Sequence, residues 1–228
     1  MCGRYAQFSA AEELAEIFQV QQITAPAGEL LPSWNVAPTQ GVRVIADSLT
    51  PGTRTMEVAR WGLIPTWAKD PAIGARMINA RAETVAEKPS YRGPLRYYRC
   101  IIPADGYYEW QAPPAGRRLK TPFYFRRSDG KPLAFAGLYS LWRDELLTCT
   151  IITRQARGDL AAIHHRQAVH LDDSTVDTWL DPTLQEPATL SELLALDCPD
   201  LEFHPVSRQV NAVRNNTPAL ITAIDAND

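Results

Sequence analysis

The sequence predicts an α+β fold with a curved, mainly antiparallel, barrel-like β core and peripheral helices. Three observations carry this prediction. Short runs rich in β-branched and aromatic residues are separated by turn clusters such as 50–52 and 128–130, a spacing typical of antiparallel strands. Helical patterns precede and follow these runs. The chain has 228 residues, 45% of them apolar, which is enough to bury one core, and we expect a single domain over residues 1–228.

The first element is predicted to be a helix. The stretch Ser9-Ala-Ala-Glu12 matches a capping box, in which a hydroxyl and a carboxylate satisfy the first free N–H groups of a helix. Leu14, Ile17 and Phe18 then share one face at helical spacing, so we expect the helix to run to about residue 20. A proline-containing loop is expected to follow over residues 32–39.

The β core is predicted from runs of strand-forming residues at 42–46, 56–61, 98–102, 122–126, 133–139 and 147–153. The basic stretch 111–121, which contains Pro and Gly, is interpreted as a hairpin loop rather than a domain boundary. Later helices are expected at 157–163, 174–180 and 190–196. A second capping box, Thr189-Leu-Ser-Glu192, opens the last of them.

Composition excludes several classes of protein. The N-terminus lacks a basic and apolar leader, and no stretch approaches 18 uninterrupted apolar residues, so we expect a cytoplasmic protein without a membrane partner. The four cysteines, at positions 2, 100, 149 and 198, never form a CxxC pair. This spacing argues against a zinc site and a disulfide framework, and we expect no metal and no cofactor. Cys100 and Cys149 lie in apolar runs and are predicted to be buried, inert thiols.

Charge is unevenly distributed along a chain whose net charge is −3. Residues 1–127 hold 13 Arg and 3 Lys, whereas residues 128–228 hold 6 Arg and 1 Lys. The first segment is therefore the candidate face for a polyanion. Arginine suits bidentate phosphate contact and stacking on bases, although a GC-rich genome would produce the same preference for Arg over Lys.

Cys2 is the most informative residue of the chain. Removal of Met1, which a small second residue permits, would give Cys2 an α-amine and a thiol on one carbon. Such a pair traps aldehydes, because the amine forms a Schiff base and the thiolate closes onto the imine carbon to give a thiazolidine. A free α-amine has a pKa of about 7.7–8.0 and a free thiol about 8.5, so both have a reactive fraction near neutral pH. The alternative is that a cysteine follows the initiator by chance.

Two further side chains are candidates for proton transfer. Glu109 lies between Tyr108 and Trp110, where loss of water would raise its pKa and suit it to general acid–base work. His164 is a candidate proton shuttle. The alternatives are a surface glutamate between packed aromatic residues and an ordinary surface histidine.

Several short motifs occur in order over some 200 residues. They are Met1-Cys-Gly-Arg4, Trp34-Asn-Val-Ala-Pro-Thr39, Trp61-Gly-Leu-Ile-Pro65, Asn79-Ala-Arg-Ala-Glu-Thr84, Ile102-Pro-Ala-Asp-Gly-Tyr-Tyr-Glu-Trp110, Phe135-Ala-Gly-Leu-Tyr139, Ile151-Ile-Thr153, Ile163-His164, Val206-Ser207 and Val210-Asn211. Together they resemble the SRAP (SOS response-associated peptidase) family of abasic-site-processing proteins. The resemblance implies a single SRAP-like domain that shields abasic sites in single-stranded DNA by a covalent thiazolidine crosslink. We expect such a protein to act as a monomer, and to associate with the nucleoid when bound to DNA.

The resemblance also assigns roles to individual residues. Cys2 matches the nucleophile, Asn79 the residue that orients the cysteine and the sugar, Glu109 the carboxylate that handles protons, and His164 the histidine that assists opening of the sugar ring. The phosphate-binding positions are Arg4, Arg81 and Arg166. Trp67 and Pro38 are expected to act as wedges against neighbouring bases, where stacking is worth about 1–3 kcal/mol per base.

The chain departs from the family pattern after Ile163. The family commonly reads His-Asp-Arg-Met-Pro, whereas this sequence reads His164-His-Arg-Gln-Ala168. The change bears on the shape of this loop and on the tuning of His164, and slower ring opening or slower crosslink reversal would follow. Lyase activity on DNA and autoproteolytic removal of Met1 are considered as further activities of such an abasic-site-processing protein. Two other functions are considered: a cysteine autopeptidase of the N-terminal-nucleophile type, and a noncatalytic DNA-binding or modified-base-binding module.

Overall fold

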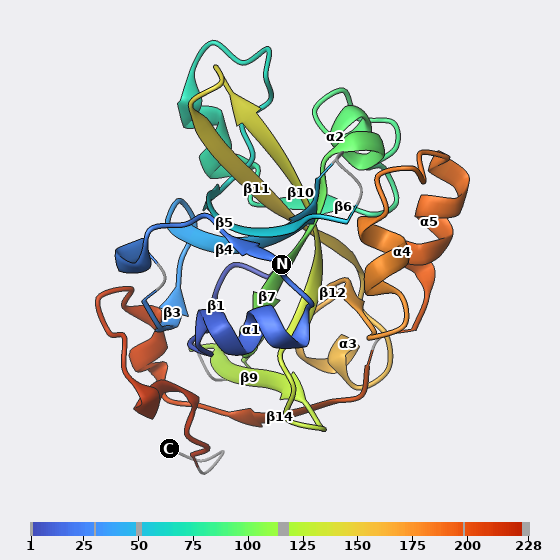
Figure 1. The fold of residues 1–228 in the computed structure, drawn as a ribbon. Coiled ribbons are helices and arrows are strands. Elements are labelled where there is room, and N and C mark those ends of the chain that lie inside the picture. The colour runs from blue at the N-terminus through green and yellow to red at the C-terminus, as the bar shows by residue number, and fades with distance from the viewer. Residues whose placement is uncertain (1, 30, 49–51, 114–118, 198, 225–228) are drawn as a thin grey trace.

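The fold centres on a curved sheet that closes on itself. The computed structural model describes residues 2–29, 31–48, 52–113, 119–197 and 199–224. The strands of the closed ring are β4 (Gly41–Asp47), β5 (Arg54–Trp61), β7 (Arg99–Ala104), β10 (Leu133–Trp142) and β11 (Leu146–Gln155). They follow the order β11-β10-β7-β4-β5, and a pairing between β11 and β5 completes the ring (Figure 1). The four pairings along that order are antiparallel, and the closing one is parallel.

Short strands extend this sheet beyond the ring. They are β2 (Gln22–Ile23) on β5, β6 (Asn79–Arg81) and β12 (Arg166–Ala168) on β11, and β13 (His170–Leu171) on β10. The pairings of β6 and β12 are important for function, because they bring residues that are far apart in sequence to the two sides of β11.

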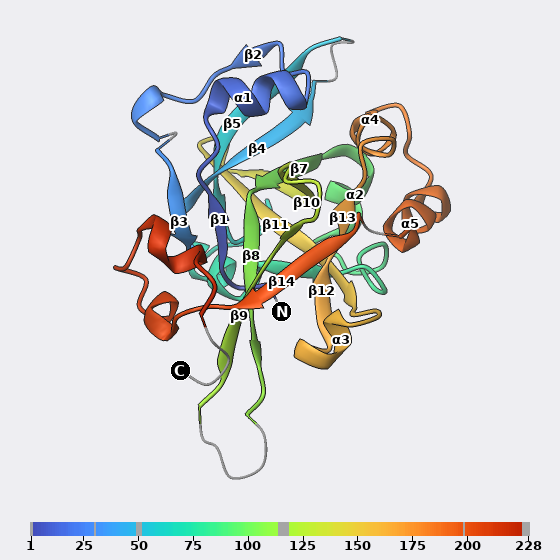
Figure 2. The same cartoon turned by 90° about the horizontal axis from the view of Figure 1, so that it is seen from below.

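A second sheet packs beside the first and runs in the order β14 (Leu201–Pro205), β9 (Thr121–Arg127), β8 (Gly106–Gln111), β1 (Tyr5–Gln7) and β3 (Ser33–Val36). Figure 2 shows β8 and β9 running side by side as a hairpin. Gln111 pairs with Thr121 at its open end. The stretch 111–121 therefore connects a hairpin, as predicted, although its residues 114–118 lie outside the described part of the chain.

The α-helices lie on the outside of the sheets (Figure 1). They are α1 (Ala11–Ile17), α2 (Arg92–Tyr97), α3 (Leu160–Ile163), α4 (Val176–Leu180) and α5 (Pro187–Ala195). Short 3₁₀ turns occur at η1 (Ala27–Glu29), η2 (Pro71–Arg76), η3 (Arg208–Asn211) and η4 (Pro218–Ile221). Among the residues that the structure describes, no helix has the length and apolar character needed to span a bilayer. The predicted α+β class, with a curved and mainly antiparallel core and peripheral helices, is confirmed.

Two large apolar clusters form on opposite sides of the closed sheet. One cluster contains residues from the helices, including Leu14, Leu95, Trp179 and Leu190. The other joins the ring strands to the second sheet and contains Cys2, Tyr5, Trp61, Tyr107 and Phe135. The rings of Tyr5 and Trp61 meet edge to face in this cluster, with 5.1 Å between their centres. The N-terminal segment is therefore part of the core.

Neither predicted capping box forms. The Ser9 hydroxyl donates to the carboxylate of Asp105, so α1 begins at Ala11 without a side-chain cap. In α5 the first helical residue is Pro187, which already has a helical φ and no N–H group that needs a partner. Thr189 consequently lies inside the helix. These two expectations from local sequence are wrong because Asp105 engages the Ser9 hydroxyl and because α5 begins two residues before Thr189.

Several predicted boundaries also change. The expected loop over 32–39 contains strand β3, which pairs with β1. The helix expected over 157–163 is shorter and starts at Leu160. The six predicted strands all occur, and β10 and β11 extend three and two residues further at their C-terminal ends. Long-range pairing, rather than local propensity, sets these limits.

Candidate active site around Cys2

Cys2 is fully buried at the edge of the core. Its backbone carbonyl accepts a hydrogen bond of 2.8 Å from the Asn79 side-chain amide. Burial raises the pKa of the Cys2 thiol, and the nearby negative charge of Glu109 raises it further. The thiol is therefore protonated at neutral pH, and it needs a proton acceptor in order to react as a thiolate.

Asn79 is held by the pairing of β6 with β11, in which it lies opposite Ile151. Its side-chain nitrogen contacts Cys2, whereas its side-chain oxygen is buried and accepts no hydrogen bond within the described structure. A buried acceptor without a partner costs about 1–3 kcal/mol. An unpaired buried acceptor of this kind is typical of a position where a ligand supplies the missing hydrogen bond. Asn79 is therefore a candidate for contact with a substrate hydroxyl.

Glu109 lies on β8, the neighbour of β1. Tyr107 pairs with Tyr5 in this ladder, so the register carries Glu109 back to the start of the chain. Its side chain is almost completely buried, and burial raises the pKa of Glu109 to about 7. A carboxyl group with this pKa exchanges protons at neutral pH, as general acid–base catalysis requires.

His164 lies beside Glu109. Its Nδ1 atom is 3.9 Å from a carboxylate oxygen of Glu109 and 3.0 Å from the backbone nitrogen of Arg166. Burial lowers the pKa of His164, and the adjacent His165 lowers it further. The rings of His164 and His165 are 4.4 Å apart. A histidine in place of the family's aspartate therefore shifts the pKa of His164 in the direction opposite to the one an acidic neighbour would produce.

The predicted phosphate contacts have different surroundings. Arg4 directs one guanidinium nitrogen inward, at 2.9 Å from the Asn35 side-chain oxygen and 2.6 Å from the Val210 carbonyl. Arg81 is exposed at the end of β6. Arg166 forms a two-point ion pair with Glu83, with distances of 2.6 and 2.9 Å.

Arg81 and Arg166 lie on opposite sides of the same strand. Arg81 pairs with Thr153 of β11, and the Arg166 guanidinium donates to the Thr153 carbonyl at 2.6 Å. The two residues are 85 positions apart in sequence, and the sheet brings them to one place. Their proximity to the segments that carry Asn79 and His164 is consistent with a shared binding face.

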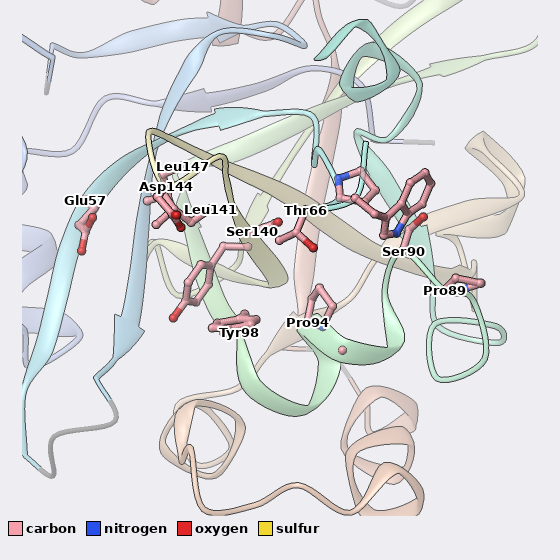
Figure 3. Close-up of a pocket in the computed structure, with 14 residues that line it drawn as sticks. Glu57, Thr66, Pro89, Ser90, Pro94, Tyr98, Ser140, Leu141, Asp144 and Leu147 are labelled. Atoms are coloured by element: carbon pink, nitrogen blue, oxygen red, sulfur yellow. The ribbon is translucent and has the colours of Figure 1, made fainter. Parts of the chain in front are cut away.

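The two predicted stacking residues, Trp67 and Pro38, have different surroundings. Trp67 is 60% exposed and lines a groove of about 560 Å³ (Figure 3). This groove is formed by α2, by the β10–β11 hairpin and by residues 65–67, and Cys2, Asn79, Glu109 and His164 are not among its lining residues. Pro38 is half-buried just after β3. An exposed tryptophan at a groove is available for stacking.

Asn35 is a structural element of the site for which the sequence alone gives no role. It is buried, and its side-chain nitrogen donates to the carbonyls of Val210, Ala212 and Asn215. It also accepts from Arg4. Asn35 thus holds the 210–215 segment against the N-terminus. The sequence did contain one indication of this role, because Asn35 is a polar residue inside a short apolar motif. A polar residue is expected to be buried only when its hydrogen bonds are satisfied.

Two further cysteines lie in the described part of the chain, whereas Cys198 lies outside it. Cys100 and Cys149 are fully buried, as predicted, and burial raises the pKa of each thiol. Within the part of the chain that the structure describes, no three His, Cys, Asp or Glu side chains come together in a way that would hold a metal ion.

Comparison with known proteins identifies relatives along almost the whole chain. The profile of the family described as "SOS response associated peptidase (SRAP)" matches residues 1–213. The abasic site processing protein YoqW of Bacillus subtilis is 43% identical over 226 residues, which cover 97% of this chain and 99% of that protein. The abasic site processing protein HMCES of Gallus gallus is 34% identical over 235 residues, covering 87% and 68%. A crystal structure of a Bacteroides thetaiotaomicron protein is 25% identical, covers 98% and 100%, and superimposes with a TM-score of 0.82.

Proposed function

Because this chain belongs to the SRAP family, whose relatives above are named abasic site processing proteins, we propose that it processes abasic sites in DNA. We further propose that it acts as a monomer on single-stranded DNA and forms a covalent thiazolidine through Cys2. The observation that carries the proposal is the group around Cys2, in which Asn79 bonds its backbone and Glu109 perturbs its thiol. A buried glutamate whose pKa is about 7 has no evident structural use at this position.

The chemistry begins with opening of the deoxyribose ring, which exposes the aldehyde. His164 and Glu109, 3.9 Å apart, are suited to move a proton from the anomeric hydroxyl to the ring oxygen. The Asn79 side-chain oxygen is free to accept a hydrogen bond from a sugar hydroxyl. These groups would therefore hold the reactive aldehyde beside the N-terminus.

The amine of Cys2 then attacks the aldehyde carbon, once Met1 has been removed. A carbinolamine forms and loses water to give an imine: protonated Glu109 gives a proton to the departing hydroxyl and takes one back from the nitrogen. The thiol next adds across the C=N bond. The sulfur–carbon bond forms while the thiol proton passes, by way of Glu109, to the nitrogen. No oxidant or metal is needed, because atoms and electrons balance in each step.

The burial of the thiol favours this order of attack. A buried Cys2 thiol is protonated at neutral pH, whereas a model α-amine with a pKa of about 7.7–8.0 is unprotonated in roughly a tenth of the molecules. The amine therefore reacts first, and the thiol closes the ring. Arg4, Arg81 and Arg166 would bind the phosphates of the strand, and Trp67 and Pro38 would stack against bases that flank the lesion.

The test is incubation of the protein with an abasic single-stranded oligonucleotide, followed by a denaturing gel and intact mass measurement. Wild type should give an adduct that survives denaturation. Cys2→Ala should give none, and Cys2→Ser should give at most an imine that borohydride traps. A heat-stable adduct of normal yield from Cys2→Ala would refute the proposal. A peptidase or a simple DNA-binding module would form no covalent adduct in any variant.

A further inference from the structure

The Glu83–Arg166 ion pair lies between the two segments that carry Asn79 and His164. Glu83 follows β6, and Arg166 starts β12. The two guanidinium nitrogens of Arg166 donate to the two carboxylate oxygens of Glu83 at 2.6 and 2.9 Å. This is the bidentate geometry with which arginine also binds a phosphate group.

The two partners of this ion pair are held to different degrees. The Arg166 side chain is 12% exposed and that of Glu83 is 48% exposed. Arg166 is also anchored to the Thr153 carbonyl at 2.6 Å, through one guanidinium nitrogen. Beyond the ion pair, the Glu83 carboxylate accepts only backbone hydrogen bonds within the described structure, one of 3.2 Å from the Gln155 nitrogen and one from its own residue. The carboxylate is therefore the exchangeable partner, and it occupies the solvent side of a fixed guanidinium.

We propose that Glu83 occupies the phosphate-binding position of Arg166 in the DNA-free protein and has to be displaced when single-stranded DNA binds. This inference rests on the function proposed above. The hydrogen bonds from Arg166 lower the pKa of Glu83, so the carboxylate stays charged and competes at neutral pH. Glu83 also borders a groove lined by Gln155, Arg157 and Ser191, which gives the displaced side chain room to move.

The consequence is a lower affinity for DNA in general. A half-exposed ion pair is weak, and a phosphate can replace it. Each binding event nevertheless has to break the Glu83–Arg166 ion pair, whether or not the DNA carries a lesion, and this cost lowers the affinity. A protein that forms a covalent bond at abasic sites gains from weak reversible binding elsewhere, because it then leaves undamaged strands quickly. Glu83 thus sets the strength of reversible DNA binding, and it acts through Arg166.

The experiment uses Cys2→Ala protein, so that no covalent step contributes, and an undamaged single-stranded oligonucleotide followed by fluorescence anisotropy. Glu83→Gln should tighten binding about two- to fivefold at low salt. Arg166→Ala should weaken binding. In the Arg166→Ala background, Glu83→Gln should change the affinity no more than the control substitution described next. Glu87→Gln is the matched control, since it removes an exposed carboxylate four residues away in the same segment.

Three results would overturn the inference. Binding by Glu83→Gln that equals or falls below that of its parent would show that the carboxylate does not compete. An equal gain in the Arg166→Ala background, or in Glu87→Gln, would show a general charge effect. Absence of DNA binding by the parent would refute the proposed function together with this inference. Thermal unfolding checks that each variant folds, and Arg166→Lys replaces Arg166→Ala if the alanine variant does not, because lysine cannot form the two-point pair.

Discussion

Replacing Glu109 with Gln should stabilise the protein while it slows the chemistry. Burial raises the pKa of Glu109 from 4.5 to about 7. Ionisation of Glu109 is therefore harder in the folded protein than in the unfolded chain. The contribution of protonated Glu109 to the free energy of unfolding is fully present below about pH 4.5 and is lost as the pH rises through 7. At 1.36 kcal/mol per pKa unit, the full loss amounts to about 3 kcal/mol. Glutamine keeps the shape of the side chain and has no charge to bury.

The measurement is the melting temperature of wild type and Glu109→Gln at pH 5 and pH 8.5. Between pH 5 and pH 8.5, the free energy of unfolding of Glu109→Gln relative to wild type should rise by about 2–3 kcal/mol. For a chain of this size, this corresponds to a rise of roughly 5–10 °C in relative melting temperature. Crosslinking in single-turnover assays should fall by about 10²–10⁴-fold. Glu83→Gln is the control, because the pKa of Glu83 is lowered and this variant should gain nothing at high pH. A difference between wild type and Glu109→Gln that is equal at both pH values would refute the reasoning.

Further predictions concern the DNA face, acid stability and the backbone. In Cys2→Ala protein, Arg81→Ala should reduce the slope of log K against log salt by about 0.7, one phosphate contact, whereas Arg208→Ala should change it little; equal slopes would place the DNA on another surface. Burial lowers the pKa of His170 to about 3, so stability should fall by up to about 1.4 kcal/mol per pH unit from pH 6.5 down towards 3. His170→Phe should flatten that decline in denaturant titrations, and an unchanged decline would contradict the assignment. Gly62 has φ +132°, and a Cβ there would lie 2.5 Å from the Gly74 carbonyl oxygen. Gly62→Ala should therefore cost at least about 2 kcal/mol in chemical denaturation, and a cost near zero would show that the backbone adapts.

The long strands were predictable because their apolar runs are continuous and bounded by turn residues. The short strands β1, β6 and β12 were not, since three residues carry no measurable periodicity. They are strands because a neighbour supplies hydrogen bonds. The capping box expected at Ser9 fails for the same reason. The Ser9 hydroxyl donates to Asp105, which lies 96 positions away in the sequence. Local sequence indicates a propensity, and tertiary contacts decide the result.

The candidate site was predictable as a set of residues but not as a geometry. The resemblance selected Cys2, Asn79, Glu109 and His164, and their roles remain predictions. The flanking aromatic residues suggested that Glu109 is buried, but only the structure shows that burial, and burial is what raises the pKa of Glu109. The inward turn of Arg4 toward Asn35 and Val210 depends on a segment more than 200 residues further along the chain. The partner of Arg166 could not be predicted either, because only the fold brings Glu83 beside it.

The burial of Cys2 bears on when Met1 could be removed, a step that the proposed crosslink requires. In the folded chain Cys2 is enclosed by the core and bonded to Asn79, and β1 is paired to β8. The strand that pairs with β1 ends at Gln111, and at about 5–20 residues per second the ribosome needs roughly 5–20 s to reach it. On the proposed mechanism, removal of Met1 from the nascent chain would therefore compete with docking of the segment that carries Cys2.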